Sequence, residues 1–273
     1  MRVLAQGANV VDLGWAELIA SFSLIAVAVG ISLWLRLRLA WPILEASLRA
    51  LVQLALVGVL FNLIFEAGGA HVFAWAWVLA MVAITVVVVS RRAPAIPDLW
   101  RSVLVAVLLS TGVALGLIFG LGVFEHEPVT VVVMAGITLG NVLPSAVLAA
   151  KQVEFSFIDG ADEVEALLAL GFDTRGATRF IGPRAARTAL VVQIERTKVV
   201  GLVALPGAMT GLLLAGVEPM DAVLVQLVVM YLVLGATVIV VTSIIWSASR
   251  SAFTADLRLA PWTMRERTIR DPT

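Results

Sequence analysis

Long apolar runs, separated by short polar stretches, dominate the hydropathy pattern of this 273-residue chain. Seven runs are near or above the length of about 20 residues that crosses about 30 Å of hydrocarbon as a helix. These runs cover roughly residues 15–35, 43–65, 72–90, 99–120, 129–150, 198–216 and 221–247. The pattern therefore predicts an all-α, polytopic membrane protein with seven transmembrane helices.

Positive charge is concentrated in every second loop. Of the 19 lysines and arginines, all except Arg2 lie around the first, third and fifth loops or in the C-terminal tail. Because cytoplasmic loops are enriched in lysine and arginine, this alternation predicts an N-terminus outside and a C-terminus inside. The cytoplasmic side then carries a long segment, about 151–197, between spans 5 and 6, and a poorly packed polar tail, about 249–273.

Composition agrees with this class of protein. Hydrophobic residues make up 61% of the chain and charged residues 14%, which lies far outside the soluble range. The formal net charge of zero gives no reason to expect nucleic acid as a partner, whereas membrane lipid is one. There is no cysteine, which excludes disulfides and thiolate metal sites. No repeat or linker divides the chain, so residues 1–273 are expected to form one transmembrane domain.

The long cytoplasmic segment contains a short acidic, amphipathic pattern at 161–171. Its apolar positions follow the spacing of one helix face: Val164, Leu167, Leu168 and Gly171. Helices that lie on membranes usually carry lysine and arginine on their polar face. This one is acidic, so we expect it to dock against a protein, although a helix lying on the membrane remains the alternative.

The ends of this helix and the start of the next also have sequence signals. Asp162, followed three residues later by Glu165, predicts an N-terminal cap, and Gly171 predicts a C-terminal cap. Pro183 is expected to begin a second helix that continues without a break into the sixth span. Within that span, Pro206 is expected to kink the helix.

The same segment resembles the EAA signature of ABC-transporter permeases. Glu165-Ala166 is followed by Gly171 six residues after the glutamate, while Leu167 stands where the signature has a second alanine. In that family the motif docks into a groove on a separate ATP-hydrolysing subunit. The resemblance implies these ATPase-coupling residues: Asp162, Glu165, Ala166, Leu168 and Gly171.

ATP hydrolysis is expected on a partner subunit. A P-loop requires Gly-Lys followed by serine or threonine, and neither Lys151 nor Lys198 follows a glycine. We therefore expect no cofactor in this chain, with ATP and Mg bound by the partner, and no enzymatic activity in the chain itself.

A more specific resemblance runs from about residue 136 to 245. The stretch from Lys198 to Gly211, together with Gly140-Asn141, resembles the FetB-type permeases, which are bacterial iron-export ABC permeases related to plant membrane proteins of aluminium tolerance. The resemblance implies a multi-pass protein of the bacterial inner membrane that exports iron or another metal. It also implies a FetA-type ATP-binding subunit, in an assembly of two permeases and two ATPases. Leu143 and Pro144 depart from the methionine and asparagine expected there, which leaves the substrate open.

Polar or flexible positions inside the spans are candidates for a translocation pathway, because such side chains usually face the interior of a helix bundle. The candidates are Gln53, Asn141, Pro206, Met209, Thr210 and Gln226. Asn141 and Pro144 together predict a broken helix whose freed carbonyls could coordinate a cation. Hydrogen bonding between helices is the alternative role. Glycines at 112, 116 and 120 predict a close seam between helices.

The predicted outer loops carry acidic and imidazole side chains that suit divalent metal ions. The candidate metal ligands are Glu66, His71, Glu125, His126 and Glu127. Solvated acidic turns are the alternative interpretation.

Three other functions compete with an ATP-driven metal permease. A secondary, ion-coupled transporter usually needs a carboxylate near the middle of the membrane, and the predicted span centres contain neither aspartate nor glutamate. An ABC permease for a non-metal substrate would show the same coupling segment. A membrane enzyme or scaffold is disfavoured because no nucleophile and base pair stands within the spans.

Overall fold

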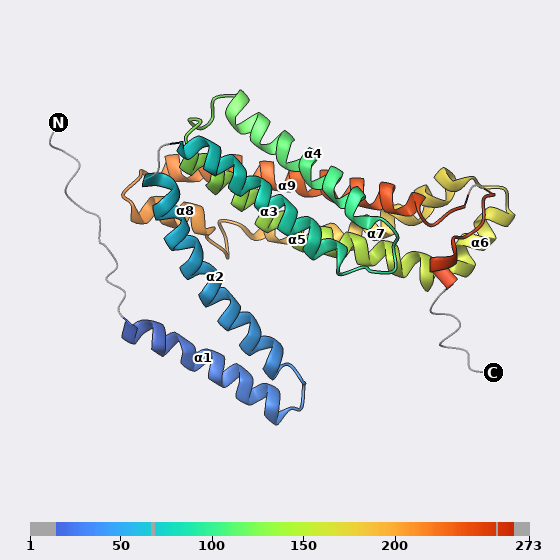
Figure 1. The fold of residues 1–273 in the computed structure, drawn as a ribbon, viewed down its shortest axis with the longest axis horizontal. Helices are drawn as coiled ribbons and strands as arrows, with labels where there is room; N and C mark the ends of the chain where they lie inside the picture. Colours follow the sequence, from blue (N-terminus) through green and yellow to red (C-terminus); the bar gives the residue numbers. More distant parts are fainter. Residues whose placement is uncertain (1–14, 67–68, 255, 265–273) are drawn as a thin grey trace. The chain divides into compact units, whose positions relative to one another are not determined.

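The computed structural model describes residues 15–66, 69–254 and 256–264, apart from the side chains of 15–18, 60 and 62–66. This part of the chain is all-α, as the hydropathy pattern predicts, and it forms nine α-helices and one short 3-10 helix (Figure 1). The α-helices are α1 (Trp15–Trp34), α2 (Ala40–Glu66), α3 (Ala70–Ser90), α4 (Leu99–Gly120), α5 (Pro128–Ile158), α6 (Ala161–Ala169), α7 (Thr174–Val199), α8 (Gly207–Leu214) and α9 (Pro219–Arg250). The 3-10 helix η1 is Pro261–Met264.

Two compact units make up the chain. The smaller unit contains α1 and α2, which pack against each other, together with residues 214–216. The larger unit contains α3 to α7, most of α8, α9 and η1. All functional geometry described below lies within the larger unit.

The core of the larger unit is built around α5 and α9, which run side by side (Figure 1). Both begin with proline, whose fixed φ suits the first position of a helix. Helix α4 packs along α9, where the buried Ser110 hydroxyl donates to the carbonyl of Ala236 at 2.9 Å. Helix α7 packs against both α5 and α9, which closes the bundle.

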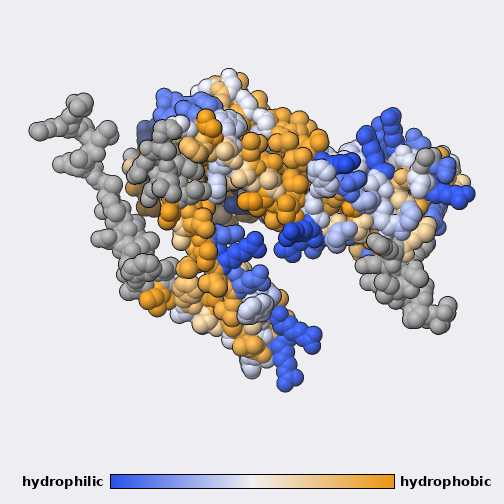
Figure 2. Space-filling view, viewed as in Figure 1, coloured by the Kyte–Doolittle hydropathy of each residue, from blue (hydrophilic) through white to orange (hydrophobic). Residues whose placement is uncertain are grey.

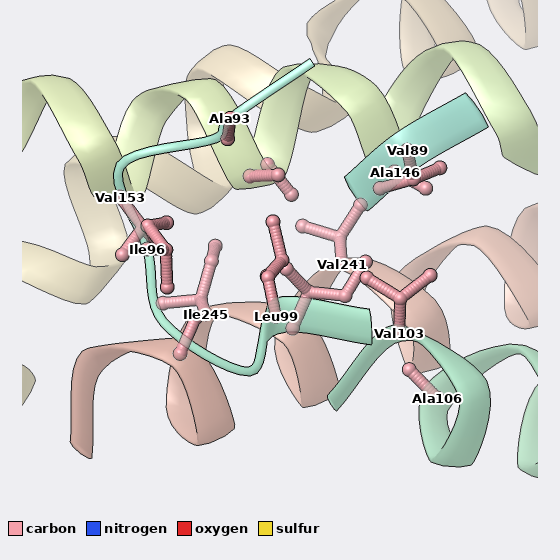
Figure 3. Close-up of a cluster of buried hydrophobic side chains, with 14 of the residues drawn as sticks. Val89, Ala93, Ile96, Leu99, Val103, Ala106, Ala146, Val153, Val241 and Ile245 are labelled. Atoms are coloured by element: carbon pink, nitrogen blue, oxygen red, sulfur yellow. The ribbon is translucent and has the colours of Figure 1, made fainter. Parts of the chain in front are cut away.

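The loop between α3 and α4 is anchored in this core. Ala93, Ile96 and Leu99 are buried and lie next to Val153 of α5 and Ile245 of α9 (Figure 3). The Ala95 amide also donates to the Glu154 carboxylate at 3.1 Å. Apolar contacts and one hydrogen bond therefore hold the α3–α4 loop against α5 and α9, although the hydropathy pattern predicts only a loop there.

Five described helices are long and apolar enough to cross a membrane, namely α2 over Ala40–Val59, α3, α4, α5 and α9. Ile19–Trp34 of α1 is a shorter apolar stretch. The chain is therefore polytopic, whereas the number of seven spans and their orientation stay predictions.

The sixth predicted span is not one helix, so the expectation of an unbroken, kinked helix there is wrong. Helix α7 ends at Val199, and α8 begins only at Gly207. Gly201 takes the left-handed backbone conformation, with φ of 85°, which an α-helix does not contain. Pro206 lacks an amide hydrogen and disfavours helical backbone in the residue before it. The glycine and the proline together interrupt the helix.

Two other prolines lie inside continuous helices, contrary to expectation. Pro183 is in the middle of α7 rather than at the start of a helix, and Pro144 is inside α5, which is not broken at Asn141. A proline removes only one intrahelical hydrogen bond. Buried neighbours on the same helices, Ile181 and Ala146, hold these segments in the core.

The glycines of α4 do not form the predicted close seam. A Cβ atom placed at Gly112, Gly116 or Gly120 would meet no other atom within 4 Å. These glycines instead line an apolar cavity of about 370 Å³ between α3 and α4.

The chain after α9 is better packed than its polar sequence predicts. Leu259 and Trp262 are buried in the core, and the Trp262 indole donates to the carbonyl of Ser251 at 2.9 Å. The Phe157 ring of α5 makes edge contacts with the rings of Phe253 and Trp262. Residues 251–264 are therefore anchored to the core through Ala252, Leu259, Ala260 and Trp262, while position 255 and residues 265–273 lie outside the described residues.

Candidate functional site

A polar cavity of about 210 Å³ lies between α5, α7, the segment before α8, and α9. Each helix contributes residues that share one face, at spacings of three or four. The lining residues are Ile137, Asn141, Gln193, Arg196, Thr197, Val200, Pro206, Gly207, Ala208, Gln226, Val229, Met230 and Val233.

A hydrogen bond between α7 and α5 crosses one side of this cavity. The Arg196 guanidinium donates through Nη1 to Oδ1 of Asn141 at 2.7 Å. The Asn141 amide in turn donates through Nδ2 to the carbonyl of Ile137 at 2.7 Å. The asparagine is therefore held by its own helix and presents its oxygen to the arginine.

The α9 residues of the cavity include a buried polar atom without a partner. Gln226 is 8% exposed, and its Oε1 has no hydrogen-bond partner among the described residues. A buried acceptor left without a donor costs about 1–3 kcal/mol. Gln226 therefore presents an acceptor to any donor that enters the cavity.

The cavity lies at the depth of the candidate spans. Asn141 is about 20 Å along α5 from Pro128, and Gln226 is about 10 Å along α9 from Pro219, at 1.5 Å per residue. Both residues belong to helices long and apolar enough to cross a membrane. Arg196, bonded to Asn141, is exposed and brings a positive charge next to these helices. Charged residues beside membrane-spanning segments are often functional.

The structure brings together half of the predicted pathway residues. Asn141, Pro206 and Gln226 line the polar cavity. Met209 and Thr210 are half-buried on α8 beside the lining residues Pro206 to Ala208 but do not line the cavity themselves. Gln53 lies on α2 in the other unit.

The hydropathy pattern did not predict that α7 contributes to the wall of the polar cavity. Gln193, Arg196 and Thr197 line the cavity, although hydropathy assigned this polar stretch to the cytoplasm or to the edge of a span. Their spacing of three and four residues was the available signal, because it places them on one helix face.

The short helix α6 forms where the sequence predicts it. Its buried face consists of Ala161, Val164 and Leu167. At its end Gly171 has φ of 90°, its amide donates to the carbonyl of Leu168, and the Phe172 amide donates to that of Leu167. This is a Schellman motif, so the predicted C-terminal glycine cap is confirmed.

The predicted N-terminal cap of α6 is wrong. The cap residue is Gly160 and no side chain caps the helix, while Asp162 lies in the first turn. In the first turn the negative charge of Asp162 interacts favourably with the helix dipole, although its side chain accepts no capping hydrogen bond. Glu163 instead pairs with Arg184 of α7 at 3.1 Å on the surface.

The coupling residues inferred from the family signature divide between two faces. Glu165 and Ala166 are exposed, whereas Leu168 is half-buried and packs against the core. Hydrophilic residues gather at the end of the larger unit that contains α6 (Figure 2). Exposed apolar side chains stand among them, including Leu170 at 76% and Phe172 at 47%. This surface therefore offers both carboxylate and apolar contacts.

The predicted metal ligands come together only in part. The rings of His71 and His126 stack at 5.7 Å between centroids, with Phe119 edge-on to His126 at 5.0 Å. Among the described residues no three histidine, aspartate or glutamate side chains are gathered as a metal site would need. Glu125 and Glu127 are exposed beside this pair, and the Glu66 side chain lies outside the description.

A family model matches residues 15–253, nearly the whole described chain, and its description is Uncharacterised protein family (UPF0014). This chain belongs to the UPF0014 family. No solved structure matches it.

Three UPF0014 relatives show the range of the family. The chain is 33% identical to "UPF0014 membrane protein STAR2" of Oryza sativa subsp. japonica, over 83% of this chain and 79% of the relative. It is 30% identical to "Protein ALUMINUM SENSITIVE 3" of Arabidopsis thaliana, over 83% and 82%. It is 29% identical to "Probable iron export permease protein FetB" of Escherichia coli (strain K12), over 80% and 84%. The resemblance stated from the sequence is thus confirmed.

Proposed function

We propose that this UPF0014 chain is the membrane-spanning permease of an ATP-driven exporter of iron or another metal, with ATP and Mg bound by a separate FetA-type subunit. The observation that carries the proposal is α6, which buries Val164 and Leu167 while exposing Glu165 and Ala166. A relative named as a probable iron export permease supports the same function. The chain is then a non-enzymatic, multi-pass protein of the bacterial inner membrane.

The coupling surface is proposed to be the exposed side of α6 and the turn that follows it. Helix α6 ends at Ala169, two residues before Gly171. The Schellman hydrogen bonds at Gly171 and Phe172 fix the direction in which the chain leaves the helix. The Glu163–Arg184 pair joins α6 to α7, and Arg196, three turns further along α7, lines the cavity. A displacement of α6 by the ATPase would therefore be carried along α7 to the polar cavity.

The wider assembly follows from the same proposal. One transmembrane domain over residues 1–273, seven spans with the N-terminus outside, and two permeases with two ATPases are its expected architecture. Short outer loops with His71 and His126 would lie at the exit side, where a metal site remains a prediction.

The test is ATP-dependent uptake of radiolabelled iron into inside-out vesicles that contain this chain and its ATPase. Glu165→Lys reverses the exposed charge of α6, and we expect it to lower both uptake and ATPase co-purification at least about tenfold, a loss of about 1.4 kcal/mol in binding. Glu218→Lys is the matched control, because Glu218 is an exposed glutamate at the opposite end of the unit, before α9. Unchanged co-purification and uptake with Glu165→Lys would contradict the proposed coupling surface.

A further inference from the structure

The polar cavity has a positive charge and no carboxylate. Arg196 is the only charged residue among the described residues that line it. No carboxylate in the described part of the chain lies within ion-pair distance of this guanidinium. The adjacent Glu195 is bonded on the surface to Lys198 at 2.7 Å, so the two neighbouring charges offset each other.

The other polar groups of the cavity are neutral and do not replace a carboxylate. The Asn141 oxygen already accepts from Arg196, and the Thr197 hydroxyl donates to the carbonyl of Gln193 at 2.8 Å. Gln226 Oε1 remains the buried acceptor without a partner. Divalent and trivalent metal ions prefer charged oxygen or imidazole ligands, and none lines the described cavity.

An arginine in such surroundings is suited to a different ligand. Its planar guanidinium has five N–H donors, and only one donation, to Asn141, is seen here. The remaining donors match the geometry of carboxylate and phosphate groups. Arg196 is exposed and lines the cavity, and its only partner among the described residues is the neutral Asn141, so its positive charge is available to an anion that enters.

We propose that the polar cavity binds an oxyanion-bearing ligand, with Arg196 holding a carboxylate or phosphate group and Gln226 accepting a hydrogen bond from a hydroxyl of the same ligand. This inference rests on the proposed exporter function and names its substrate class: a metal crosses as an anionic complex with such a ligand and not as a bare cation.

The first test measures binding to the full chain purified together with its ATPase, by equilibrium dialysis. The probes are radiolabelled citrate, radiolabelled inorganic phosphate, ferric citrate labelled in the iron, and ferrous chloride. We expect saturable binding of citrate or phosphate, which identifies the preferred oxyanion, and of the ferric complex if citrate is preferred. If the wild-type chain binds ferrous ion saturably and binds neither citrate nor phosphate, the proposal is overturned. This result can be obtained with the wild-type chain alone.

The second test compares three arginine substitutions. Arg196→Gln should weaken oxyanion binding at least about tenfold, the size expected for a charge-assisted hydrogen bond in a cavity, and Arg196→Lys should restore part of it. Arg187→Gln is the matched control, because Arg187 and Arg196 are both exposed on α7 but only Arg196 lines the cavity. Oxyanion binding that is equal in Arg196→Gln and Arg187→Gln would contradict the assignment.

The two proposals fail in different ways. Oxyanion binding by a chain that no ATPase accompanies would uphold the cavity assignment and overturn the exporter. ATP-driven transport of uncomplexed ferrous ion, abolished by Glu165→Lys and unaffected by Arg196→Gln, would uphold the exporter and overturn the oxyanion site.

Discussion

Two cavities of the larger unit each contain a buried polar atom without a hydrogen-bond partner, but the residues around that atom differ. The cavity between α5, α7 and α9 contains the unpartnered Gln226 Oε1, and the cavity between α3 and α4 contains the unpartnered Thr111 Oγ1. The first is about 210 Å³ and has a guanidinium and two further amides in its wall. The second is larger, about 370 Å³, and its wall is glycine, aliphatic and aromatic apart from Thr111 and His126.

The difference shows that volume alone does not mark a binding site in a membrane protein. An apolar gap between helices is available to lipid or to another helix, and the single hydroxyl of Thr111 offers a ligand only one polar contact. A cluster of amides with a charge beside it offers several polar contacts to a ligand, which an apolar gap does not. Substitutions in the two cavities should therefore separate function from stability.

The largest expected effect is that of Gln226→Leu in the polar cavity. Replacement removes the unpartnered acceptor, so thermal stability should stay equal or rise, while ATP-driven uptake into inside-out vesicles should fall at least about tenfold. Uptake and melting temperature would be measured on the same preparation. Normal uptake by Gln226→Leu would show that the polar cavity is not on the transport route.

A second substitution changes the charge of the polar cavity and also removes one donor, the Asn141 amide that bonds to the carbonyl of Ile137. Asn141→Asp places a carboxylate 2.7 Å from the Arg196 guanidinium, where it should neutralise the positive charge. We expect oxyanion binding to weaken about tenfold, measured by equilibrium dialysis, with the chain still folded. Asn141→Ser keeps a neutral acceptor and serves as the control. Tighter oxyanion binding by Asn141→Asp would contradict the electrostatic argument.

The apolar cavity should respond only in stability. Thr111→Val removes a buried hydroxyl that has no partner, whereas Thr237→Val removes one that donates to the carbonyl of Val233 at 2.7 Å. Thr237→Val should be less stable than Thr111→Val by about 1 kcal/mol, measured by thermal unfolding in detergent, and both should transport normally. A loss of transport in Thr111→Val alone would make the α3–α4 cavity functional as well.

The smallest effect is expected for the glycines that line the apolar cavity. Gly116→Ala adds a methyl group into open space, so it should stabilise α4 by up to about 1 kcal/mol through helix propensity. Gly136→Ala is the comparison, because its Cβ would lie 3.3 Å from Cε of Met81 and the gain should be smaller. Thermal unfolding of both variants distinguishes these cases. A clear loss of stability in Gly116→Ala would show that another helix packs closely on this stripe.

Local patterns were enough to predict the long apolar helices and the turn at Gly171, but not the break between α7 and α8, because hydrophobic spacing and a glycine cap depend on residues close in sequence. They were not enough for α7. Its polar residues were assigned by average hydropathy, and only the packing of α7 against α5 and α9 shows that Arg196 reaches Asn141.

The same limit explains the prolines and the tail. Pro183 and Pro206 have equal local propensity to end a helix, yet buried neighbours hold the first in place, whereas a left-handed Gly201 precedes the second. Trp262 is buried only because the chain returns to Ser251 and Phe157, which a sequence pattern does not reveal.

The interruption between α7 and α8 has one more consequence, which concerns the lipid around the protein. Val200 and Pro206 line the same cavity as the first half of α9, yet residues 200–206 are not helical, and the side chains of Leu202 and Val203 are 88% and 83% exposed. Hydrocarbon offers no hydrogen bonds to irregular backbone, so such a segment is stable in a bilayer only against water or protein. The amides of residues 201–204 already donate to the carbonyls of Val199 and Ala204, so it is the remaining polar backbone groups of this face that favour water or protein over acyl chains.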